Sequence, residues 1–239
     1  EPGAAEFRDA TVAAEKARVA ETAELEAYRK RVKTRKNVFI SFGSYGVGVL
    51  TYVLIVVCVI VAIYSKLGTD GDVLRHLFIT DPELGGGGFL PEVMAGQVWR
   101  LFTPMFIHFG PIHLIFNMMW LYQLGCMIEA RRSSLNLLAV IATTALLSNL
   151  AQYVVTGFPK FGGMSGVVYG LAGYVWIRGT YDRASGLFLD RQSVTILLVW
   201  LVICYTGIMG PVANTAHLVG LIAGMIWGGI SALFAKSSG

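Results

Sequence analysis

Four polar side chains in otherwise apolar stretches have the types needed for covalent catalysis. Ser165 and His217 could act as a nucleophile and its general base. His113 and Asn117 are four residues apart and share a helix face, so both could donate hydrogen bonds towards one point. Ser165 is expected to open a helix, where free backbone N–H groups and the helix dipole favour an oxyanion. These residues predict acyl transfer with a serine nucleophile.

Tyr169 follows Ser165 by four residues on the same expected helix face, where its ring could pack against an imidazole and orient it. Such a contact matters because the apolar stretches offer no Asp or Glu to hold His217. Simpler interpretations stay open, with Ser165 as a helix cap and His217 as a packed core histidine. His108, at i+5 spacing from His113, is expected to point away from it and to be structural.

Other mechanisms lack the residues they need. The sequence contains no H-E-x-x-H, so zinc-dependent proteolysis lacks its ligands, and no Asp lies in an apolar stretch to form a paired-aspartate site. The sequence around Ser165 lacks the second glycine of G-x-S-x-G. The three cysteines are expected to be packing residues, because each lies in a different apolar stretch. We expect neither a metal nor a cofactor.

The composition is that of a membrane protein. The 239 residues are 55% hydrophobic and 14% charged, with a mean hydropathy of +0.62. Soluble domains carry about a quarter charged residues, so the lipid bilayer is the expected surrounding. The net charge of +4 does not indicate a nucleic-acid partner, because nine of the nineteen basic residues precede residue 37, just before the first apolar stretch.

The pattern predicts an all-α membrane protein with six transmembrane helices. A polar and basic arm, residues 1–36, precedes one membrane domain, residues 37–239. The expected spans are 46–64, 104–128, 135–155, 165–177, 194–209 and 212–235. With the N-terminus inside, the inner segments carry fifteen basic residues and the outer segments four, which predicts that both termini are cytoplasmic.

The fourth span is short and is expected to start inside the membrane. Its thirteen residues rise about 20 Å against about 30 Å of hydrocarbon. With Arg178 at the inner surface, Ser165 should lie about 10 Å below the outer one. The same counting places His113, Asn117 and His217 in the outer half. The sequence therefore predicts a wet cavity open to the outer side.

Five short motifs follow one another between residues 99 and 236. They are Trp99-Arg100, His108-x4-His113-x3-Asn117, Glu129-Ala130-Arg131, Gly163-Met164-Ser165-Gly166 with Tyr169, and Ala216-His217-x2-Gly220-x3-Gly224. In this order they resemble the rhomboid family of intramembrane serine proteases, most closely its bacterial type. The arm at 1–36 shows no matching motif.

The resemblance implies a six-helix rhomboid bundle with a catalytic dyad of Ser165 and His217 and no third acid. It implies an oxyanion hole formed by His113, Asn117 and the Ser165 backbone N–H, with Tyr169 stacking on His217. It gives supporting roles to Gly163, Gly166, Gly220, Gly224, Trp99, Arg100, Glu129 and Arg131. Pro104 departs from bacterial relatives, which often carry a histidine or another polar residue there.

The activity that the resemblance implies is serine endopeptidase cleavage in or near transmembrane segments of membrane-protein substrates. The expected location is a bacterial inner membrane, with the active site open to the outer side. Two alternatives stay open. One is a rhomboid-like protein that binds and escorts membrane proteins without cleaving them, although such relatives typically lack the dyad. The other is a small transporter or channel.

Overall fold

The computed structural model describes residues 15–16, 18–19, 46, 48–83, 89–208 and 210–237, and all regular structure in them is helical. The chain divides into two units, Glu1–Val38 and Phe39–Gly239. The arm predicted for residues 1–36 lies outside the described residues, apart from four helical ones at 15–16 and 18–19. The second unit carries every feature discussed below.

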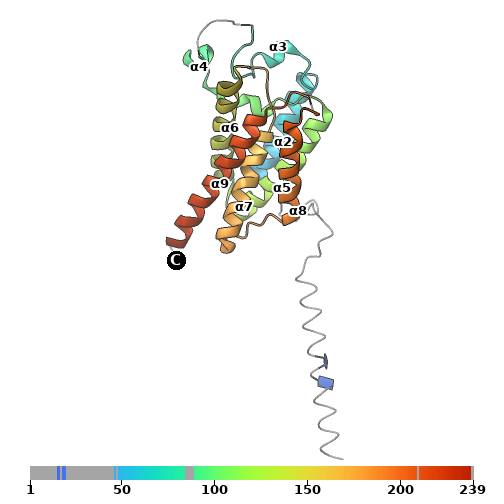
Figure 1. Ribbon diagram of the computed structural model, residues 1–239, viewed down its shortest axis with the longest axis vertical. Helices are drawn as coiled ribbons and strands as arrows, with labels where there is room; N and C mark the ends of the chain where they lie inside the picture. Colours follow the sequence, from blue (N-terminus) through green and yellow to red (C-terminus); the bar gives the residue numbers. More distant parts are fainter. Residues whose placement is uncertain are drawn as a thin grey trace, which may run out of the picture. The chain divides into compact units, whose positions relative to one another are not determined.

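Six long helices form the bundle of this unit (Figure 1). They are α2 (Val49–Tyr64), α5 (Pro111–Arg131), α6 (Ser134–Thr156), α7 (Ser165–Tyr181), α8 (Arg191–Tyr205) and α9 (Asn214–Ser237). The loops carry the short helices α3 (Gly71–Leu74) and α4 (Pro91–Met94) and the 3-10 turns Val98–Leu101, Thr103–Phe106 and Arg183–Ser185. Each expected span overlaps one long helix. By length and composition, α6 and α9 are each suited to cross a membrane, and α2 and α8 are shorter apolar helices.

Two predicted helix boundaries were wrong. α5 begins at Pro111 rather than at residue 104, because Gly110 takes a φ of +92° and a separate 3-10 turn precedes it. α7 continues to Tyr181, and Arg178 lies inside it, 2% exposed and paired with Asp182 at 2.7 Å. Arg178 therefore does not mark the inner end of α7. At 17 residues, about 26 Å, α7 is not the shortest long helix.

Close backbone contact joins α7 and α9. A Cβ on Gly220 would collide with the carbonyl oxygen of Gly166, and one on Gly224 would collide with that of Gly170. Small residues spaced four apart are the usual means by which helices in a membrane approach this closely. The two glycines of α9 therefore fix the spacing between these helices.

Glu129, near the end of α5, holds the beginning of α2. Its carboxylate accepts the backbone N–H groups of Leu50 and Thr51 at 3.0 and 2.8 Å and the Thr51 hydroxyl at 2.5 Å. These backbone donors have no partner inside their own helix, so the carboxylate caps α2 from another helix. The Ser134 hydroxyl also donates to Glu129, at 2.7 Å, which brings in the start of α6.

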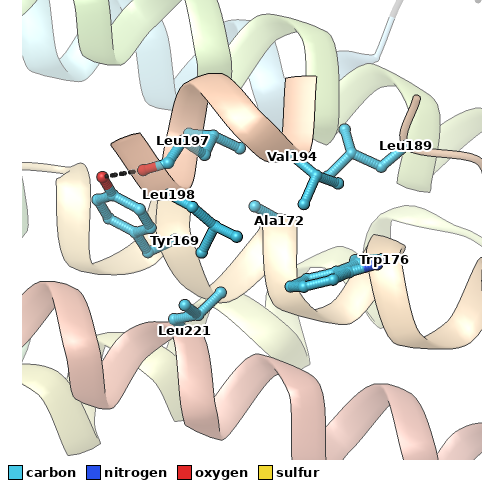
Figure 2. A pocket seen from close by; sticks show the side chains of 8 residues that line it. All are labelled: Tyr169, Ala172, Trp176, Leu189, Val194, Leu197, Leu198 and Leu221. Carbon is cyan, nitrogen blue, oxygen red and sulfur yellow. Dashed lines mark hydrogen bonds between the residues drawn. The ribbon is translucent and has the colours of Figure 1, made fainter. Parts of the chain in front are cut away.

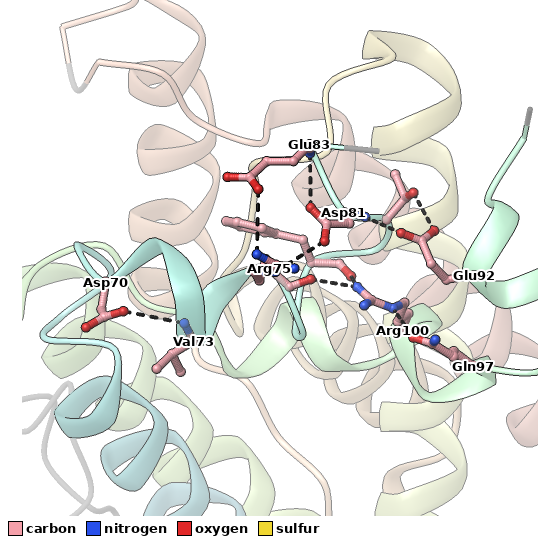
Figure 3. Close-up of polar contacts among 10 residues, drawn as sticks. Asp70, Val73, Arg75, Asp81, Glu83, Glu92, Gln97 and Arg100 are labelled. Carbon is pink, nitrogen blue, oxygen red and sulfur yellow. Dashed lines mark hydrogen bonds and ion pairs between the residues drawn. The ribbon is translucent and has the colours of Figure 1, made fainter. Parts of the chain in front are cut away.

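The long loop between α2 and α5 is organised around buried Arg100 (Figure 3). Arg100 Nε donates to Gln97 Oε1 at 2.7 Å, and its Nη1 donates to the carbonyls of Arg75 and Phe78 at 2.8 and 2.9 Å. A guanidinium can be buried when its donors are satisfied in this way. The preceding Trp99 is 52% exposed.

Glu92 makes the second buried polar contact of this loop. It accepts the Thr80 hydroxyl and the Asp81 backbone N–H, each at 2.6 Å. Burial by itself would raise the pKa of Glu92. The hydrogen bonds from Thr80 and Asp81, together with the charge of Arg100, outweigh burial and lower its pKa below the ordinary value.

Candidate active site

Ser165 and His217 meet at the contact between α7 and α9. Ser165 is the first residue of α7, His217 lies in the first turn of α9, and His217 Nε2 is 2.7 Å from Ser165 Oγ. The His217 side chain is buried, at 4% exposed. Among the described residues its Nδ1 has no hydrogen-bond partner. The pair is therefore a serine–imidazole contact without an acidic third member in the part of the chain described.

Tyr169 lies one turn after Ser165 and covers the imidazole. The Tyr169 and His217 ring centroids are 5.0 Å apart, with the planes tilted by 36°. The Tyr169 hydroxyl donates to the Leu197 carbonyl of α8 at 2.9 Å (Figure 2). The ring contact limits rotation of an imidazole whose second nitrogen has no acceptor, so Tyr169 can orient His217.

His113 and Asn117 reach the same place from the first half of α5. The Phe109 N–H donates to His113 Nδ1 at 3.3 Å, which leaves the ring proton on Nε2. Gly163, with a φ of +135°, has no Cβ, which lets the His113 ring lie against its backbone. The point that a Cβ of Gly163 would occupy is 2.7 Å from His113 Nε2 and 3.4 Å from Ser165 Oγ. A donor and the candidate nucleophile therefore lie close together beside Gly163.

Asn117 is buried and donates one amide hydrogen to the His113 carbonyl at 2.9 Å. A primary amide has two donors, so the second remains for a ligand. Asn117 also lines the cavity described next, on the side of α5.

A cavity of about 630 Å³ opens beside the Ser165–His217 pair. His113, Asn117 and Tyr169 line it, with large apolar side chains of α5, α8 and the segment before α7. The volume is that of a ligand-binding cleft rather than a packing defect. The predicted gathering of polar residues from three helices is therefore seen as one site.

Two residues that were not predicted to belong to the site also line the cavity. Gln152 of α6 is buried, lines the cavity and accepts the Ala216 N–H at 3.1 Å. A glutamine in an apolar stretch is itself a signal of function, and it could have been selected on that ground. Lys160, in the segment before α7, lines the cavity as well.

His108 is closer to the site than predicted. Its ring centroid is 5.1 Å from that of His113, so the expectation that it points away was wrong. The helical spacing did not apply, because His108 precedes Gly110 and lies outside α5. His108 is fully buried, with Nδ1 3.1 Å from the Phe106 carbonyl and Nε2 3.5 Å from the Met164 N–H. These contacts agree with the structural role expected for it.

The remaining residues with expected supporting roles lie away from the cavity. Trp99 and Arg100 belong to the long loop, and Glu129 to the α2–α5 contact. Arg131 lies beside Gly186, where a Cβ would come within 3.2 Å of its Cδ. The described residues contain no group of three or more His, Cys, Asp or Glu that could hold a metal ion.

Known proteins share this combination of motifs. Residues 95–233, which contain all five motifs, match the family model of the rhomboid domain. The chain belongs to the rhomboid family. Rhomboids are integral membrane proteins, and the helices of this one fit that setting.

Several relatives of this rhomboid carry the name rhomboid protease GlpG. The chain is 36% identical over 190 residues to those of Salmonella choleraesuis (strain SC-B67), Salmonella paratyphi A (strain ATCC 9150 / SARB42) and Salmonella typhi. The alignment covers 79% of this chain and 65% of each relative. The chain therefore spans slightly less than two thirds of their length.

Proposed function

We propose that this rhomboid is an intramembrane serine endopeptidase that cleaves peptide bonds in or near transmembrane segments of membrane proteins. The observation that carries the proposal is the 2.7 Å contact between Ser165 Oγ and His217 Nε2 at the wall of a cavity of about 630 Å³. Relatives named rhomboid protease GlpG give independent support.

In the proposed reaction, His217 takes the hydroxyl proton of Ser165 as Oγ attacks the scissile carbonyl carbon. The C–N bond of the tetrahedral intermediate then breaks, and His217 gives its proton to the leaving amine. A water molecule then attacks the acyl-enzyme carbonyl as His217 takes its proton, and the ester bond to Ser165 breaks as His217 returns that proton to Oγ. Tyr169 holds the imidazole plane during these transfers, and no step needs a metal or a cofactor.

The oxyanion of the intermediate would lie next to Ser165, within reach of three proposed donors. The His113 Nε2–H, the free amide hydrogen of Asn117 and the Ser165 backbone N–H are its proposed donors. Each such donor is worth about 3 kcal/mol in the transition state. The position of His113 supports this assignment, because its Nε2 and Ser165 Oγ lie only 2.7 and 3.4 Å from the position that a Cβ of Gly163 would take, so this donor is close to the nucleophile.

In the proposed topology the six long helices are the spans, both termini are cytoplasmic, and the cavity opens to the outer side of a bacterial inner membrane. The excess of basic residues in the inner segments supports this orientation. Large apolar side chains exposed along the long helices support lipid contact, among them Val53, Ile60, Ile222, Ile226 and Leu233. Substrates would then arrive sideways from the bilayer, with the scissile segment locally unwound.

A fluorophosphonate probe for activated serines tests the proposal without knowledge of the substrate. Wild type in mild detergent should be labelled, Ser165→Ala and His217→Ala should not, and Ser133→Ala, which changes an exposed serine, should be labelled like wild type. Equal labelling of Ser165→Ala would move the nucleophile elsewhere. If folded wild type is neither labelled nor active on a transmembrane substrate in liposomes, the result would favour the alternative of a rhomboid-like protein that binds and escorts membrane proteins without cleaving them.

A further inference from the structure

The charge of the cavity wall is distributed unevenly. Among the described lining residues, Lys160 is the one Lys or Arg. The other polar lining residues are uncharged types or histidines. No Asp or Glu is among the lining residues in the described part of the chain. Lys160 itself is exposed, and across the described ranges it forms no ion pair. The cavity mouth therefore presents one uncompensated positive charge.

The backbone on both sides of Lys160 is held in place. Pro159 accepts the Phe161 N–H at 2.9 Å, and Phe161 is buried in an apolar cluster with Ile79 and Leu90. Further along, the Gly163 N–H donates to a loop carbonyl at 3.0 Å. The backbone of Lys160 is therefore held at the cavity that its side chain lines.

Lys160 lies near enough to Ser165 for a bound peptide to extend to it, since both line the same cavity. Lys160 precedes Ser165 by five positions, so their Cα atoms cannot lie more than about 17 Å apart even in an extended chain. A substrate with its scissile carbonyl at Ser165 has side chains within that radius on both sides of the bond. An acidic side chain that comes within a few ångströms of the Lys160 ammonium would meet a cation that has no ion-pair partner among the described residues, with the modest attraction of an exposed pair.

We infer that Lys160 is a specificity determinant: it selects membrane-protein segments that carry Asp or Glu within a few residues of the scissile bond, on the part exposed at the cavity mouth. This inference rests on the proposed protease function and adds a substrate class to it. A basic residue at the same place is disfavoured, because it meets a like charge.

The experiment uses the full chain in liposomes and a fluorogenic transmembrane substrate. One position at a time among the residues flanking the cleavage site carries Asp, Asn or Lys, and the readout is the ratio of kcat/KM for Asp to that for Asn. A ratio within one enzyme variant removes differences in folded fraction. At the best position wild type should give a ratio of about five, which falls as salt is added.

The variants separate charge from shape. Lys160→Gln should bring the ratio to about one, Lys160→Arg should keep it, and Lys160→Glu should turn the preference towards Lys. Arg132→Gln removes an exposed cation at the other end of α5, about 29 Å along the helix from His113, and should keep the wild-type ratio.

A wild-type ratio near one at every position, or an unchanged ratio in Lys160→Gln, would overturn the role of Lys160 while cleavage of the Asn substrate kept the protease function intact. Failure of the protease function looks different, since no substrate would then be cleaved and wild type would not be labelled by the probe.

Discussion

α8 and α9 flank α7 in different ways. α9 meets α7 backbone to backbone through glycines, with Gly220 against Gly166. α8 meets α7 through side chains such as Leu198, next to Ala172 and Trp176, and a gap of about 10 Å³ remains there (Figure 2). Three of the fifteen residues of α8 are buried. The same helix thus has one tight neighbour and one loose neighbour.

The difference in packing density between the two contacts matches the residues that each contact holds. Ser165 and His217 need a separation of 2.7 Å, and they lie on the two tightly packed helices. α8 supplies cavity wall, including Leu197 and Trp200, and a wall tolerates small shifts. Close packing is concentrated where proton transfer requires it.

The largest expected effect comes from breaking the tight contact. Gly220→Val adds atoms where even a Cβ collides, so the helices must separate and the Ser165–His217 contact lengthens. Because a displacement of about 1 Å can cost 100-fold, kcat/KM should fall by at least about 100-fold. Gly229→Ala is the matched control on the same helix, since its Cβ would lie 3.8 Å from Ile177. Loss of activity in the control as well would show that α9 tolerates no change at all.

Removing the ring that covers His217 should have the next largest effect. Tyr169→Ala should lower kcat/KM by about tenfold, a loss of about 1.4 kcal/mol in transition-state stabilisation, because nothing else described holds the imidazole plane. Tyr169→Phe keeps the ring and loses the bond to the Leu197 carbonyl, so it should cost about 1 kcal/mol of stability and little activity. Steady-state kinetics and thermal unfolding in detergent measure both. Equal kinetic losses in the two variants would assign the effect to the hydroxyl instead.

A change on the loose side should be milder. Leu198→Ala enlarges an existing gap at a side chain that is 36% exposed, so it should cost about 1–2 kcal/mol of stability, at or below the lower end for such truncations. We expect kcat/KM to stay within twofold of wild type. A loss comparable to that of Gly220→Val would mean that α8 positions the site as closely as α9 does.

The smallest expected effect lies in the loop and depends on pH. The lowered pKa of Glu92 means that its carboxylate stabilises the fold above the ordinary carboxyl pKa, and this contribution is lost as pH falls through the lower folded-state value. At neutral pH the free energy of unfolding of Glu92→Gln should therefore be about 1 kcal/mol lower than that of wild type. This difference should shrink as the pH is lowered. Thermal unfolding from pH 7 to pH 3 measures this. A difference that grows towards low pH would contradict the assigned direction.

The closeness of Ser165 and His217 in space could be predicted from the sequence. Both have the right chemical type near the expected start of a helix, and the glycines after His217 indicate a close partner helix. The start of α5 was misplaced because apolar residues continue through residues 101–109, although Gly110 and Pro111 were readable as a helix start.

It was harder to predict from the sequence which residues line the cavity. Whether Gln152 or Lys160 faces Ser165 depends on the rotation of one helix and the path of a loop relative to other helices. Spacing along a single helix carries no information about that rotation. The burial of Arg178 was missed for a related reason, because its partner Asp182 lies one turn further on, beyond the expected end of the helix.

The cap on α2 has a consequence for synthesis of the protein. Leu50 and Thr51 precede Glu129 by 79 and 78 residues. At 5–20 residues per second the ribosome needs roughly 4–16 s to make that stretch. During this interval the first long helix must satisfy its leading amides with water or lipid headgroups, and it reaches its final hydrogen bonding only after the end of α5 has been made.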